Sequence, residues 1–133
     1  MTTVDSSVLI AALSTWHVAH KAAADVVKRE GLRVGGHVLL ETYAVLTGGA
    51  LQHRVRPELA VRALAAFAPP LTLSPEGHLA TVRRCTSSGV QGGAVYDALV
   101  AATAAEAGAS LISRDRRAAR IYEIIGVAYD LIA

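Results

Sequence analysis

The chain contains few cysteines, few aromatic residues and few charged residues, and these shortages limit what the protein can be. Cys85 is the one cysteine among 133 residues, which excludes an internal disulfide and a thiolate-rich metal site. A reducing cytoplasm is therefore the expected location. Aromatic residues make up 5% of the chain, so we expect alanine, valine and leucine to supply most of the core.

Long apolar runs and sorting signals are missing as well. The longest stretch without Asp, Glu, Lys or Arg covers residues 6–20 and contains two histidines. It is shorter than the roughly 18 apolar residues of a membrane helix. Residues 1–5 lack the basic residues that open an export signal. The formal net charge of +2 does not indicate binding to long nucleic acid by charge alone.

The composition that remains is that of one folded domain, which we expect to span residues 1–133. Hydrophobic residues make up 53% of the chain and charged residues 18%, which is typical of a chain with a continuous core. The expected strands are residues 2–5, 32–35, 71–73, 109–113 and 127–131. The expected helices are residues 6–13, 16–30, 37–47, 57–68, a segment from 74 onward, 94–107 and 115–125. This alternation predicts an α/β fold, a three-layer sandwich with a mainly parallel central sheet.

Three acidic residues, Asp5, Glu41 and Asp97, lie in apolar segments where solubility does not require them. They are the only formally charged side chains of residues 1–20, 34–53 and 85–105. An ionised carboxylate in apolar surroundings is costly unless a cation pairs with it. Since these segments contain no Lys or Arg, a hard divalent cation with oxygen ligands is the natural partner.

A fourth acid, Asp115, follows the expected strand 109–113 and opens the next helix. Asp5 ends the first strand, while Glu41 and Asp97 fall near the starts of helices, where the helix dipole favours an anion. The carboxyl ends of parallel strands and the following helix starts share one edge of a sheet. The four acids are therefore expected to meet in one cleft.

Each acid also has a structural interpretation. Asp5 could cap a helix, Glu41 could reach solvent, and Asp115, which lies among arginines, could be a cap with surface ion pairs. Asp97 is the hardest to explain in this way, because its expected helix is apolar on nearly every side. The indication of a site comes from the four acids together.

The acids lie in four short segments of recognisable sequence. These segments are residues 4–10 (VDSSVLI), 40–41 (LE), 96–101 (YDALVA) and 111–117 (LISRDRR). Their ordered set resembles the PIN-domain ribonucleases, and more closely the VapC toxins of bacterial toxin–antitoxin modules. The resemblance extends from the first expected strand to the last.

This resemblance implies an endoribonuclease that depends on Mg2+, or on Mn2+, and is silenced by a cognate antitoxin protein. Asp5, Glu41, Asp97 and Asp115 match the acidic quartet of the family. Asp5 and Asp97 correspond to the principal metal ligands, with Glu41 and Asp115 completing the site directly or through water. RNA would be cleaved by metal-activated water, which leaves a 5′-phosphate and a 3′-hydroxyl.

Further residues are implied by the same resemblance. Ser6 and Ser113 occupy positions where the family often has a hydroxyl near the metal, although both could equally be helix caps. Arg114 and Arg116 flank Asp115 and are candidates for RNA phosphate contacts, or for solvated surface residues. A homodimer is also expected, with residues 40–51 and 57–68 as candidate faces.

One rival function belongs to a different class. In it the chain is a partner-binding module with little or no nuclease activity, and a partner arginine occupies the acidic pocket. A structure-specific DNA nuclease would use similar acids and is the third interpretation. His17 and His20 share a helical face, but no third ligand lies near them in sequence, so we interpret them as a surface pair.

Overall fold

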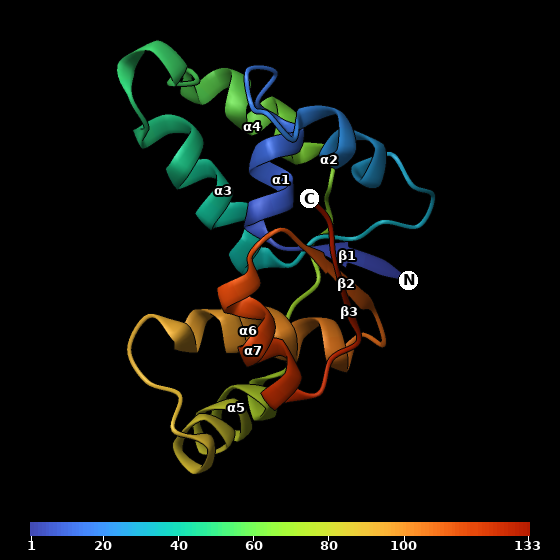
Figure 1. The fold of residues 1–133 in the computed structure, drawn as a ribbon, viewed down its shortest axis with the longest axis vertical. Helices are drawn as coiled ribbons and strands as arrows, with labels where there is room; N and C mark the ends of the chain where they lie inside the picture. The colour runs from blue at the N-terminus through green and yellow to red at the C-terminus, as the bar shows by residue number, and fades with distance from the viewer.

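A parallel β-sheet lies between two groups of helices in the computed structural model of the chain, which describes residues 1–133 except for the side chain of Leu51 (Figure 1). The strands pair in the order β1 (Thr2–Val4), β2 (Ser110–Ser113) and β3 (Tyr129–Leu131). Both pairings are parallel, with Val4 opposite Ile112 and Ile112 opposite Asp130. The first and the last strand of the sequence therefore lie on either side of β2.

Two of the expected strands, residues 32–35 and 71–73, form single parallel bridges instead of strands. Leu32 pairs with Thr2 at the free edge of β1, and Leu71 pairs with Gly35 beyond it. Gly35 is already the N-cap of the next helix, which ends the extended segment early. Pro70 has no N–H to donate to a ladder, so pairing before Leu71 cannot extend. The prediction of full strands at these two places was wrong.

The helices follow the predicted order, with some ends shifted. They are α1 (Ser6–Ala12), α2 (His20–Val27), α3 (Gly36–Gly48), the short 3-10 helix η1 (Leu51–His53), α4 (Pro57–Ala65), α5 (Pro75–Ser88), α6 (Ala94–Glu106) and α7 (Arg116–Ile125). Helix α2 begins later than predicted because residues 13–19 form turns before it. None of the helices in the described part of the chain is long and apolar enough to cross a membrane.

Alternate side chains of the sheet pack against the two helical groups, α1 to α4 on one side and α5 to α7 on the other (Figure 1). Ile112 joins the core cluster that contains Val4, Val8 and Val38. Its neighbour Leu111 joins a second cluster with Tyr122 of α7. This is the period of two expected for a strand buried on both faces. The predicted α/β sandwich with a parallel sheet is confirmed.

One buried polar atom in α3 has no hydrogen-bond partner, and it gives a test of the packing. The side chain of Thr42 is completely buried, and its Oγ1 is unpaired. We expect Thr42→Val to raise the free energy of unfolding by about 1 kcal/mol, because the buried hydroxyl is desolvated without compensation. Thermal unfolding followed by circular dichroism would measure it. The control is Thr103→Val, whose hydroxyl donates to the Leu99 carbonyl at 2.7 Å; equal stabilisation by both variants would contradict this account.

Candidate active site

The four predicted acids are placed by the carboxyl ends of two neighbouring strands and by two helices. Asp5 follows β1, and Asp115 comes just after β2, while Glu41 lies on α3 and Asp97 in the first turn of α6. Burial is the largest cause that raises the pKa of Asp97, followed by the negative charges of Asp115, Glu41 and Asp5, and the result is a shift from 3.8 to about 6. The nearby His37 acts in the opposite direction. The four carboxylates therefore share one electrostatic environment.

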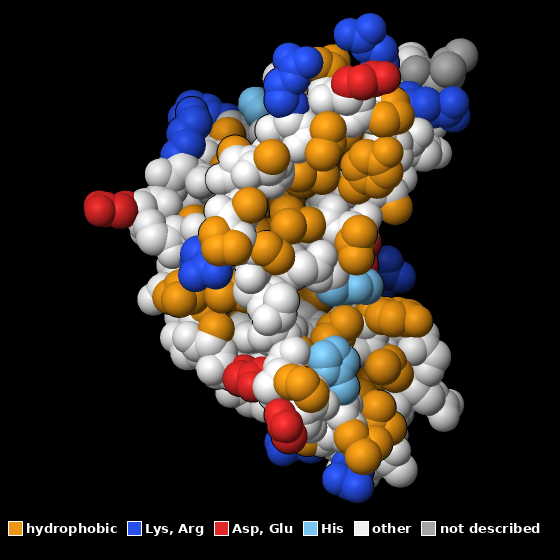
Figure 2. Space-filling model, turned by 180° about the vertical axis from the view of Figure 1, so that it is seen from behind, with side chains coloured by type: hydrophobic (Ala, Val, Ile, Leu, Met, Phe, Trp, Pro, Cys, Tyr) orange, Lys and Arg blue, Asp and Glu red, His pale blue; other side chains and the backbone are white. Residues whose placement is uncertain are grey.

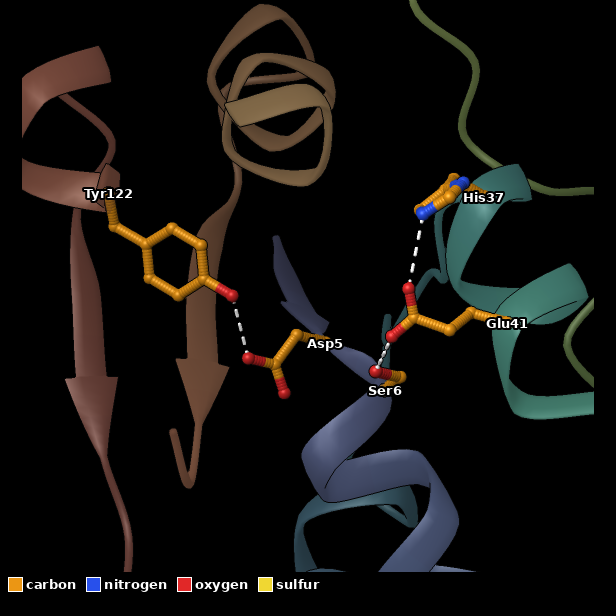
Figure 3. A network of polar contacts seen from close by, with 5 residues as sticks. All are labelled: Asp5, Ser6, His37, Glu41 and Tyr122. Atoms are coloured by element: carbon orange, nitrogen blue, oxygen red, sulfur yellow. Dashed lines mark hydrogen bonds and ion pairs between the residues drawn. The ribbon is translucent and has the colours of Figure 1, made fainter. Parts of the chain in front are cut away.

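Asp5 is the most buried of the four and is held by hydroxyl groups (Figure 3). Ser113 and Tyr122 donate to its Oδ2, the latter at 2.7 Å. Its Oδ1 accepts from the hydroxyl of Ser7 and from the backbone N–H of Val8 at 3.3 Å. The last of these contacts caps α1, so Asp5 performs the structural role considered for it while also facing the site.

Glu41 is held on both carboxylate oxygens (Figure 3). The hydroxyl of Ser6 donates to Oε1, and the imidazole Nε2 of His37 lies 3.1 Å from Oε2. The ring of His37 is also stacked on Tyr96, with centroids 5.4 Å apart and planes 9° apart. His37 was not selected from the sequence, although its spacing of four residues from Glu41 on a predicted helix was a usable signal.

Asp97 and Asp115 border an open pocket of about 440 Å3. The Oδ1 of Asp115 accepts from the N–H groups of Arg117 and Ala118, at 2.9 and 3.3 Å, and so caps α7. The prediction of a helix cap at Asp115 is therefore confirmed, whereas the surface ion pairs expected with it do not occur among the described side chains. The second carboxylate oxygen of Asp115 takes no part in the cap.

The arginines beside this pocket differ from those suggested by the sequence. Arg114 donates its Nε–H to the carbonyl of Ala133 at 3.1 Å, and Arg116 is exposed. Arg117 and Arg120 line the pocket together with Asp97 and Asp115. Their spacing of three residues puts them on one face of α7, but their distance from Asp115 in sequence gave no reason to prefer them.

The donor atoms suit a hard divalent cation, although the side chains do not enclose one as they stand. All four acids offer carboxylate oxygens, which Mg2+ prefers. Two ion pairs occur among the described residues, Lys21 with Asp25 and His37 with Glu41. Asp5, Asp97 and Asp115 therefore have no ion-pair partner among these residues. In the same part of the chain, no three His, Cys, Asp or Glu side chains lie close enough together, in their present positions, to hold a metal ion. Asp5 and Glu41 instead direct their oxygens to hydroxyls and to His37.

The chain resembles known proteins in sequence and in fold. Residues 2–124 match the PIN domain. The chain is 40% identical over 131 residues to Ribonuclease VapC40 of Mycobacterium tuberculosis, covering 96% of each, and 44% identical over 125 residues to Ribonuclease VapC27 of the same organism, covering 93% of this chain and 91% of that protein. The crystal structure of VapBC-5, a member of the VapBC family of toxin–antitoxin systems from M. tuberculosis, has a similar fold, with a TM-score of 0.62, 17% identity and 98% and 96% coverage.

The chain belongs to the PIN-domain family. The resemblance noted in the sequence, to PIN-domain proteins of the VapC type, is confirmed.

Tyr122 gives a test of how Asp5 is held. Burial, followed by the charge of Asp5, raises the pKa of Tyr122 far above its usual range, so the phenol stays protonated and donates. We expect Tyr122→Phe to lower the free energy of unfolding by about 2 kcal/mol, because it removes a buried hydrogen bond to a charged group. Tyr129→Phe is the control, since it removes an exposed bond to Glu123 and should cost below about 0.5 kcal/mol. Equal losses in chemical denaturation would contradict this view of Asp5.

Asp97 gives a test of the repulsion among the four carboxylates. Its pKa of about 6 in the folded protein exceeds the ordinary 3.8, so folding favours the protonated form. The contribution of Asp97 to stability is therefore present below pH 4 and is lost as the pH rises through 6. We expect Asp97→Asn to stabilise the protein at pH 7 in EDTA by about 1 kcal/mol, a value discounted because the carboxyl is half exposed.

The gain should shrink toward pH 4, where the wild-type carboxyl is already neutral. Chemical denaturation between pH 4 and 8 would measure it. A variant that is less stable than the wild type throughout this range would show that Asp97 is not under repulsion from its neighbours.

Proposed function

We propose that this protein is a metal-dependent endoribonuclease that acts as the toxin of a toxin–antitoxin module. The observation that carries the proposal is the set of four carboxylates around Asp97, three of them without an ion pair in the described part of the chain, at the carboxyl edge of a PIN-type sheet. Relatives that are 40% and 44% identical over nearly their whole length are named ribonucleases. Such a cluster of negative charge is unfavourable unless a cation joins it.

In this proposal Asp5 and Asp97 are the principal metal ligands, and Glu41 and Asp115 complete the site directly or through water. A divalent cation such as Mg2+ or Mn2+ would supply Lewis acidity toward a phosphodiester and an attacking water. The hydroxyls of Ser113 and Tyr122 fix the carboxylate of Asp5, while Ser6 and His37 fix that of Glu41. These contacts reduce the side-chain freedom that would otherwise be lost on binding.

The substrate backbone would be positioned by arginine. Arg117 and Arg120 line the same pocket as Asp97 and Asp115, so in this proposal their guanidinium groups donate hydrogen bonds to the phosphates that flank the cleaved one. Arg116 is exposed at the start of the same helix and is a third candidate. Arg114 is already engaged with the Ala133 carbonyl and is a weaker candidate than the sequence suggested.

The partners proposed are a cognate antitoxin protein and a second copy of the chain, in a bacterial cytoplasm. Support for an antitoxin comes from the fold, which is shared with VapBC-5 of a toxin–antitoxin system. An antitoxin arginine could pair with the acidic cluster in place of the metal ion, because the cluster has no Lys or Arg ion-pair partner among the described side chains. Occupation of the cluster in this way would block the site.

Cleavage of total cellular RNA is the decisive test. We expect the purified protein to make discrete cuts in Mg2+ or Mn2+, with 5′-phosphate and 3′-hydroxyl ends, and no cuts in EDTA. Asp97→Asn should reduce the rate at least 100-fold, because it removes a proposed ligand. Mapping the ends by sequencing would identify the RNA. Asp130→Asn is the control, since it changes an exposed aspartate on β3.

Cuts that persist in Asp97→Asn, or in EDTA, would show that the acidic cluster is not the nuclease site. Wild-type protein that cuts no RNA in either metal, yet binds an antitoxin through the cluster, would support the rival function of a partner-binding module.

A further inference from the structure

The imidazole of His37 and the phenol ring of Tyr96 form an aromatic pair directly beside the acids. His37 contacts Glu41 at 3.1 Å, and Tyr96 immediately precedes Asp97 in α6. The two rings are nearly parallel, and Tyr96 is 57% exposed. A large aromatic side chain that is fixed by stacking and still open to solvent is a surface on which another planar ring can stack.

An apolar pocket of about 140 Å3 opens next to Tyr96. It lies between α5 and α6 and is lined by Leu73, His78, Thr81, Val82, Val95, Tyr96 and Leu99. Figure 2 shows hydrophobic side chains gathered beside histidine on the lower half of the molecule, below a hollow in its outline. The volume equals about five water molecules, which suits a single planar ring and not a folded peptide.

His78, on the wall of the pocket, has spare hydrogen-bonding capacity. The Nδ1 of His78 lies 2.8 Å from the carbonyl of Ser74, which can only accept, so Nδ1 carries the proton. In the neutral ring the Nε2 of His78 is then an acceptor. The hydroxyl of Thr81 is already used, since it donates to the carbonyl of Gly77 at 2.7 Å. A mainly apolar pocket with an imidazole acceptor on its wall is suited to a ring that carries an amino group.

We propose that Tyr96, backed by His37, stacks an unpaired RNA base of the nucleotide next to the cleaved phosphate, and that the pocket beside it receives that base. The inference rests on the proposed function and deepens it, because it makes Tyr96 a specificity-determining residue. Bases that stack on aromatic side chains are unpaired ones, so the preferred substrate is a single-stranded segment or loop. A second copy of this chain is the competing occupant of the same face.

Photocrosslinking tests the position of the base independently of cleavage. The probes are single-stranded RNA nonamers in which 4-thiouridine or 6-thioguanosine takes each position in turn, mixed with the wild type and with Asp97→Asn in Ca2+. We expect crosslinks at Tyr96 or on the α5–α6 pocket, identified by mass spectrometry. Crosslinks confined to other surfaces, or no binding of any nonamer, would overturn the inference.

Variants of Tyr96 test its contribution. Tyr96→Leu should weaken nonamer binding by about tenfold or more, as expected for loss of one stacked base, while Tyr96→Phe stays near the wild-type affinity. The matched control is Trp16→Leu, because Trp16 is also exposed and stacks on a histidine ring. The ring centroids of Trp16 and His53 are 4.1 Å apart. It lies beyond the end of α1 that is opposite Asp5.

The outcomes separate this inference from the proposed function. Cleavage that is normal in Tyr96→Leu would overturn the inference and leave the nuclease intact. Crosslinking at Tyr96 by a protein that cuts no RNA would support the base site and contradict the nuclease. Dissociation of a dimer in Tyr96→Leu, measured by sedimentation, with unchanged RNA binding would assign this face to a second copy and overturn the inference.

Discussion

Repulsion among four carboxylates at one edge of the sheet is the constraint on which the site depends. Folding brings these like charges together, and the pKa of Asp97 is raised first by its burial and then by the charges of Asp115, Glu41 and Asp5. The rest of the structure offsets the repulsion with neutral donors, since hydroxyls hold Asp5 and Glu41. An arginine or lysine paired in the same place would reduce the repulsion but would fill the position of the proposed cation.

Much of the arrangement of the four acids could be predicted from the sequence, because a charged side chain in an apolar segment is costly unless a partner compensates it. Asp5 and Asp97 were identifiable since no neighbouring residue neutralises them, and their convergence followed from the geometry of parallel strands. Asp115 shows the limit of that reasoning. It performs the ordinary task of a helix cap and also borders the pocket, and a local pattern cannot separate two roles that one side chain performs together.

The groups that support the acids were harder to predict, because their contacts join distant segments. Tyr122 reaches Asp5 from α7, 117 residues away, and tyrosine is common in cores without any such role. Ser113 also contacts Asp5 from a distant strand, and only the family resemblance pointed to it. Ser7 lies two residues from Asp5, but serine at a helix start is common without such a contact. The prediction of strands at residues 32–35 and 71–73 was wrong for a different reason. Apolar composition at residues 32–35 and 71–73 suited extended structure, but a helix cap at Gly35 and a proline before Leu71 decided how far pairing could extend.

The place of β2 beside β1 has a consequence for the order in which the molecule matures. Asp5 is made early in synthesis, whereas Ser113 and Tyr122, which hold it, are made late. A nascent chain that has reached only α5 has Asp5 without the two hydroxyls that hold its Oδ2, and it lacks Asp97 and Asp115. Contacts between residues so far apart also form slowly. Under the proposed function, a ribosome would therefore finish the chain before it released an active nuclease close to its own RNA.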